Sequence, residues 1–130
     1  SRVQPPTDPA PVEAIVIAYE SASVLPACLA GLAANGVPAL VVDNASRDGS
    51  AELAGRLGAR TLRNARNEGF GRAVNIGAEA SAAERLLVLN PDVVLEPAAV
   101  GELLAAAARY PDAGLLAPRI VEPDGRPKWP

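Results

Sequence analysis

The segment Val12-Glu13-Ala14-Ile15-Val16-Ile17-Ala18 is a short, mostly apolar run that is rich in β-branched residues. Such a run is typical of a strand that is buried on both faces of a sheet. Apolar residues at helical spacing follow at Val24–Asn35, and a second short apolar run follows at Ala39–Val42. Parallel strands need crossover connections, which are usually helices. This order therefore predicts a parallel sheet that is covered by helices.

The alternation of strand and helix continues along the chain. Further strands are predicted at Ala59–Arg63 and Leu86–Leu89, and further helices after Asp48, from Phe70 and from Pro97. Asp48 is the predicted N-cap of its helix, and Leu57 and Leu104 are predicted to be buried. A last apolar stretch at Gly114–Ala117 and a hairpin at 119–125 complete the prediction. The fold class is α/β, with a mostly parallel sheet and helices on both faces.

The domain organisation follows from composition along the chain. Residues 1–11 are rich in proline and poor in apolar side chains, so we expect a flexible tail there. Residues 12–130 carry the alternating pattern, and with 49% hydrophobic residues they suffice for one compact domain with its own core.

Charge and composition exclude several classes of function. A net charge of −3 offers no basic field for nucleic acid or an anionic membrane surface. The chain has no histidine, which rules out histidine-based metal sites and Ser-His-Asp catalysis, and its one cysteine has no partner for an internal disulfide. We see no apolar run that approaches the roughly 20 residues of a membrane span, and no secretory signal. The expected compartment is the cytoplasm.

Polar residues follow the predicted strands directly. In an open α/β sheet, ligands bind outside the carboxyl ends of the strands, so these residues are expected to converge on one edge. The candidates are Tyr19, Glu20, Asp43, Asn44, Asn64, Asn67, Gly69, Asn90 and Asp92.

Several of these residues have a structural and a functional interpretation, and both stay open. Asp43 either satisfies turn amides in Asp-Asn-Ala-Ser or accepts a hydrogen bond from a base or ribose. Asp92 either leads into the next helix or holds a divalent cation that bridges a diphosphate. Arg72 is either a solvated charge or a ligand contact. The segment Gly69–Arg72 fails the G-x-G-x-x-G dinucleotide pattern, because Val74 occupies the last glycine position.

Four ordered segments carry a family resemblance: residues 15–19 (IVIAY), 41–50 (VVDNASRDGS), 67–77 (NEGFGRAVNIG) and 87–92 (LVLNPD). Together they resemble the N-terminal half of family 2 glycosyltransferases, which have a GT-A fold, and especially the rhamnosyltransferase-like members. The resemblance covers Val12 to Lys128.

The resemblance implies roles for matching positions. Tyr19 lines the nucleotide pocket, Asp43 recognises the base, and Asp92 is the ligand of a Mg²⁺ or Mn²⁺ ion. The remaining donor-binding positions are Asn67, Gly69, Arg72 and Asn90. Asn90 replaces the first acid of the family's D-x-D motif, which leaves fewer carboxylates for a metal. Glu20 departs from the Asn or His often found at its position, and its role stays open.

The resemblance also implies an activity. It is inverting transfer of a sugar from a nucleoside diphosphate sugar, dTDP-rhamnose or a UDP-sugar, to a glycan or lipid-linked acceptor. Cell-wall polysaccharide synthesis at the inner face of the membrane is the expected setting. The family's catalytic base follows the hairpin, so we expect this chain to be the donor-binding part and to lack it. Glu96 is the nearest substitute for the base, but it is interpreted as an acidic residue that stabilises the N-terminus of the next helix.

Two other functions are weighed against this one. A non-catalytic nucleotide-binding or regulatory module on the same scaffold is the main alternative, because such sheets host many functions. A nucleotidyltransferase is disfavoured, since no glycine-rich loop follows the first strand.

Overall fold

The structure, a computed structural model, describes residues 11–112 and residue 114. These residues fall into two compact units that divide between Glu96 and Pro97. The first unit contains the sheet and three helices, and the second contains one helix, α4 (Ala99–Arg109). The predicted tail up to residue 10, the apolar stretch after Gly114 and the predicted hairpin lie outside the described residues.

Four strands form the sheet: β1 (Val12–Ala18), β2 (Ala39–Asp43), β3 (Arg60–Arg63) and β4 (Arg85–Leu89). All pairs are parallel, in the order β3-β2-β1-β4. Every residue of β1 is buried, as the mostly apolar run predicts for a strand that is covered on both faces. The strand order reverses between β1 and β4, which makes that boundary the topological switch point of the sheet. The predicted parallel α/β sheet is confirmed.

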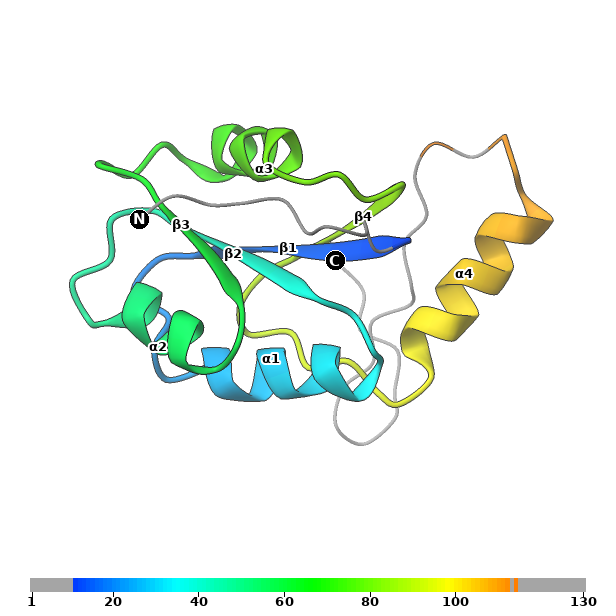
Figure 1. The fold of residues 1–130 in the computed structure, drawn as a ribbon, viewed down its shortest axis with the longest axis horizontal. Helices are drawn as coiled ribbons and strands as arrows, with labels where there is room; N and C mark the ends of the chain where they lie inside the picture. Colours follow the sequence, from blue (N-terminus) through cyan, green and yellow to red (C-terminus); the bar gives the residue numbers. More distant parts are fainter. Residues whose placement is uncertain (1–10, 113, 115–130) are drawn as a thin grey trace, which may run out of the picture. The chain divides into compact units, whose positions relative to one another are not determined.

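Helices cover both faces of this sheet, as predicted. Figure 1 shows α1 (Leu25–Ala34) and α2 (Ser50–Arg56) on one face and α3 (Phe70–Glu79) on the other. Gly77 allows α3 to lie close to the sheet. A Cβ atom added at Gly77 would lie 2.7 Å from Ile15 Cγ2 and 3.0 Å from Val42 Cγ2. The small residue therefore sets the distance between α3 and the core strands.

A buried charge cluster ties α3 to the amino ends of the strands. Glu13 in β1 is 3% exposed and pairs with Arg60 of β3, with Oε2 and Nη1 at 2.8 Å. Its Oε1 accepts a hydrogen bond from Ser81 Oγ at 2.6 Å, and Arg60 Nη2 donates to the carbonyl of Ala80 at 2.8 Å. The cluster lies at the end of the sheet away from the predicted site. Sequence analysis missed it because its members are far apart in the chain.

Two predictions for α2 need correction. The N-cap is Gly49, not Asp48, because Gly49 takes up the left-handed conformation with φ 83°. Asp48 acts from one residue earlier. Its Oδ1 accepts hydrogen bonds from the backbone and hydroxyl of Ser50, which lower the pKa of its carboxyl group. Leu57 is 46% exposed, since the helix ends at Arg56.

The helix predicted from Pro97 begins two residues later, at Ala99, after Ala98 takes a left-handed φ of 71°. Leu104, which was predicted to be buried, is exposed, and Val100 is the buried residue of α4. Glu96 therefore precedes the helix, and Glu102 is the acidic residue of its first turn. None of the helices in the described ranges is long and apolar enough to cross a membrane.

Candidate functional site

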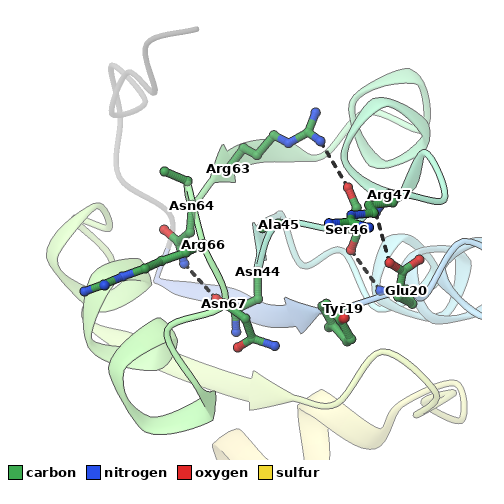
Figure 2. A pocket seen from close by; sticks show the side chains of 11 residues that line it. Tyr19, Glu20, Asn44, Ala45, Ser46, Arg47, Arg63, Asn64, Arg66 and Asn67 are labelled. Carbon is green, nitrogen blue, oxygen red and sulfur yellow. Dashed lines mark hydrogen bonds between the residues drawn. The ribbon is translucent and has the colours of Figure 1, made fainter.

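A cavity of about 1000 Å³ opens at the carboxyl ends of β1, β2 and β3 (Figure 2). The segments that line it follow these three strands, so the structure places a cavity at the edge where the sequence predicts a site. The lining residues are Tyr19, Glu20, Asn44, Ala45, Ser46, Arg47, Arg63, Asn64, Ala65, Arg66 and Asn67.

Asp43 lies beneath this cavity and is not part of its lining. Its side chain is fully buried, and both carboxylate oxygens accept hydrogen bonds from Ser46: Oδ2 from the backbone N–H at 3.0 Å and Oδ1 from Oγ at 2.6 Å. In this structure both Asp43 oxygens are engaged within the loop after β2, and the expected contact of Asp43 with the nucleotide base stays a prediction. The carboxylate shapes the loop after β2, which is the turn interpretation of Asp-Asn-Ala-Ser.

An amide network joins the loop after β2 to the loop after β3. Asn44 Oδ1 accepts hydrogen bonds from Asn64 Nδ2 at 2.9 Å and from the N–H of Glu68 at 3.3 Å. Asn44 Nδ2 donates to the carbonyl of Gly69 at 3.3 Å. Asn67 Oδ1 in turn accepts from Gly69 N–H at 2.8 Å, at the entry to α3. The network fixes the two loops relative to each other and holds Asn67 at the cavity (Figure 2).

Glu20 connects the loop after β1 to the loop after β2. Its Oε1 accepts a hydrogen bond from Arg47 N–H at 3.0 Å, and its own N–H donates to Ser46 Oγ at 2.8 Å. Glu20 and Ala45 both have positive φ values, 49° and 65°. Left-handed backbone at residues other than glycine costs roughly 1–2 kcal/mol each. Such conformations persist only where the surroundings enforce them, and they are concentrated at functional sites.

Three arginines gather at the cavity although the chain is acidic: Arg47, Arg63 and Arg66 line it, and Glu20 is its one acidic lining residue. Arg63 also pairs with Glu52 at 2.8 Å and Arg66 with Glu68 at 3.1 Å, so Arg47 is the lining arginine whose charge has no carboxylate partner among the described residues. Arg63 Nη2 donates to the carbonyl of Ser46 at 3.0 Å, which holds its guanidinium group over the loop after β2 (Figure 2). Guanidinium groups gathered in a chain of net charge −3 favour an anionic ligand. Sequence analysis missed these arginines, because a loop arginine is most often a solvated charge.

Two of the predicted residues near the entry to α3 have different surroundings. Gly69 has φ 80° and is the N-cap of α3, so glycine is needed there for the backbone path. Arg72 is not among the lining residues. Its Nε pairs with Glu68 Oε2 at 3.2 Å, and its side chain is 71% exposed. These contacts favour a solvated surface charge over a ligand contact.

Asn90 and Asp92 lie across the switch point from Tyr19. The register pairs Val16 with Leu89, so Tyr19 and Asp92 each come three residues after a paired residue, at the same edge of the sheet. Asn90 and Asp92 are both exposed. In the part of the chain that the structure describes, no three potential Asp, Glu, His or Cys ligands gather as a metal site. Any cation there has one carboxylate, Asp92, and depends on ligand oxygens for its other contacts.

Comparisons with known proteins bear on this geometry. Residues 13–130 match the family model described as "Glycosyl transferase family 2". The chain belongs to glycosyl transferase family 2. The resemblance seen in the four sequence segments is thereby confirmed, and the expectation of a glycosyltransferase is confirmed at the level of the family. The roles of the individual site residues stay predictions.

Two curated relatives come from Mycobacterium tuberculosis, strains CDC 1551 / Oshkosh and ATCC 25618 / H37Rv. Each is called N-acetylglucosaminyl-diphospho-decaprenol L-rhamnosyltransferase and is 38% identical over 102 residues, which cover 68% of this chain and 33% of the relative. The match to each of these relatives therefore spans about a third of its length.

Two solved structures show the same fold. TarS of S. aureus superposes with a TM-score of 0.68 at 17% identity, covering 85% of this chain and 23% of TarS. Glucosyl-3-phosphoglycerate synthase of Mycobacterium tuberculosis, solved with uridine diphosphate, has a TM-score of 0.59 at 17% identity. It covers 72% of this chain and 38% of the synthase.

Proposed function

We propose that this chain is the donor-binding part of an inverting glycosyltransferase that uses a nucleoside diphosphate sugar, dTDP-rhamnose or a UDP-sugar. The observation that carries the proposal is the cavity, which combines the exposed ring of Tyr19 with three arginines at the carboxyl edge of the sheet. An aromatic ring suits the face of a nucleobase, and guanidinium groups suit diphosphate oxygens. Uridine diphosphate in the structure of the mycobacterial synthase supports the same ligand class.

The proposed acceptor is a glycan or a lipid-linked sugar, as in cell-wall polysaccharide synthesis. The name of the two mycobacterial relatives, which includes a diphospho-decaprenol, supports a lipid-linked acceptor. A lipid-linked acceptor places the reaction at a membrane surface, and the proposed side is the cytoplasmic one, where nucleotide sugars are supplied.

In the proposed reaction, an acceptor hydroxyl oxygen forms a bond to the anomeric carbon of the sugar. The bond from that carbon to the diphosphate oxygen breaks, and the diphosphate leaves with the electron pair. Arg47 and Arg63 stabilise the charge that grows on the leaving group. The hydroxyl proton passes to a base. Glu20 is engaged with the Arg47 N–H, so we assign the base to the acceptor-binding part of the enzyme.

A divalent cation fits the residues beyond β4. Asp92 supplies a carboxylate oxygen and Asn90 an amide oxygen, and both side chains are exposed. Mg²⁺ and Mn²⁺ prefer such oxygen ligands, and Mg²⁺ is commonly held by one or two carboxylates together with substrate phosphates and water. When bound, the ion would offset the charge on the departing diphosphate.

Calorimetric titration with UDP and dTDP, with Mn²⁺ and in EDTA, tests the proposal. We expect Arg47→Ala to weaken binding under both conditions, and Asp92→Asn to weaken only the binding that needs Mn²⁺. Arg56→Ala, an exposed arginine of α2 outside the cavity lining, is the matched control and should bind like wild type. The proposal would be refuted if the wild-type chain bound neither UDP nor dTDP.

A further inference from the structure

One face of α1 carries the segment that follows β4. Cys28, Gly31 and Asn35 lie at helical spacing along this face, so they form a continuous stripe about 10 Å long. Leu95 and Glu96, which follow Asp92 in the chain, lie against this stripe. The backbone of Leu95 lies against Gly31, and the carbonyl of Glu96 accepts a hydrogen bond from Asn35 Nδ2 at 3.1 Å. We call Cys28, Gly31 and Asn35 the α1 seat.

The fit at Gly31 is tight. A Cβ atom added there would lie 3.0 Å from the backbone nitrogen of Leu95 and 3.2 Å from its carbonyl oxygen. These neighbours are backbone atoms, so a side chain at Gly31 requires the backbone of the segment to shift by a few tenths of an ångström. The contact thus couples the identity of one helix residue to the position of the segment that carries Asp92.

Cys28 marks the other end of the seat. Its side chain is 1% exposed. Burial, followed by the negative charge of Asp92, raises the pKa of its thiol to about 11.

We infer that the α1 seat is a positioning element that holds Asp92 at the switch point, where the proposed metal–diphosphate unit binds. The inference rests on the proposed function. β4 is an edge strand among the described residues and its pairing ends at Leu89, so the sheet does not fix the residues beyond it. The contacts with α1 supply that constraint. Gly31 and Asn35 therefore act on the metal through Asp92 and touch no substrate.

The first test separates metal-dependent from metal-free binding. In Gly31→Ala, we expect the Kd for UDP with Mn²⁺ to rise about tenfold, as for other residues that orient a metal ligand. The Kd for UDP in EDTA should stay within about twofold of wild type, because the cavity is untouched. Gly101→Ala is the matched control: Gly101 also lies inside a helix, and nothing lies within 4 Å of its added Cβ. Both variants gain the same helix propensity.

The second test uses Cys28, the only cysteine of the chain, as a reporter of the segment's movement. Its rate of reaction with a small thiol reagent at constant pH should be higher in Gly31→Ala than in Gly101→Ala. In wild type, UDP with Mn²⁺ at ten times its Kd should slow labelling roughly tenfold. UDP in EDTA at equal saturation should leave the rate unchanged, since it does not bind Asp92. If labelling of Cys28 required unfolding of the whole chain, UDP in EDTA would also slow it, because any bound ligand stabilises the folded state.

The outcomes are distinguishable. Equal metal-dependent affinity and equal labelling of the two glycine variants would overturn the inference while leaving the proposed function intact. If Gly31→Ala does not fold, the wild-type labelling rate decides: a rate that UDP with Mn²⁺ does not change overturns the inference. Lack of UDP binding by wild type overturns the proposed function, and with it the role assigned to the seat.

Discussion

Replacement of Asp43 by asparagine should lower the stability of the ligand-free chain. The same change at Asp92 should leave that stability nearly unchanged and weaken only the binding that needs a metal ion. Asp43 is fully buried and accepts two hydrogen bonds from Ser46. In Asp43→Asn, an NH2 group replaces one oxygen, so one Ser46 donor loses its acceptor and the other keeps only a neutral one. Hydrogen bonds to charged groups contribute about 1.5–3 kcal/mol. Because part of this is replaced by neutral contacts, we expect a loss of about 1–2 kcal/mol.

Thermal unfolding of the ligand-free chain measures this loss. At roughly 4 °C per kcal/mol for a domain of this size, Tm should fall by about 4–8 °C. Asp92→Asn is the control, because its exposed side chain contributes little to the fold and the change should stay within about 0.5 kcal/mol. If Asp43 contacts the nucleotide instead, the ligand-free Tm stays unchanged and only nucleotide affinity falls. That result would refute the role given to Asp43 here.

Two further predictions concern the fold around the site. Gly77→Ala should destabilise the chain by about 1–2 kcal/mol in urea unfolding, because overpacking against the sheet outweighs the gain in helix propensity; Gly71→Ala in the same helix meets nothing within 4 Å and should not. Asp48 has a lowered pKa, so its contribution to stability is complete above the unfolded value near 3.8 and is lost as pH falls through the folded value. Between neutral and acid pH, the free energy of unfolding should therefore fall less steeply in Asp48→Asn than in wild type. An identical pH dependence in the two proteins would contradict the role of the bonds between Asp48 and Ser50.

Much of the fold was predictable because periodicity reports burial directly. The mostly apolar run of Val12–Ala18 predicted a strand buried on both faces, and β1 is buried throughout. Helix ends were less predictable. The start of α4 shifted because Ala98 takes a left-handed conformation, which no local signal at Pro97 reveals.

The position of the site was predictable, but its composition was only partly so. The rule that ligands bind at the carboxyl ends of strands led to Tyr19 and Asn67, which line the cavity. The rule could not tell which way Asp43 turns, since that depends on donors offered by Ser46. The convergence of Arg47 and Arg63 depends on two separate loops that meet only in the folded chain.

The central claim is that the cavity at the carboxyl edge binds the nucleotide diphosphate. Backbone amide NMR shifts of the ¹⁵N-labelled chain, recorded as UDP or dTDP is added with Mg²⁺, test it most directly. We predict shifts in residues 19–20, 44–47 and 63–67, with Asp92 responding only when Mg²⁺ is present. Shifts confined to the opposite end of the sheet, around Glu13 and Arg60, or no shifts at saturating nucleotide, would contradict the account.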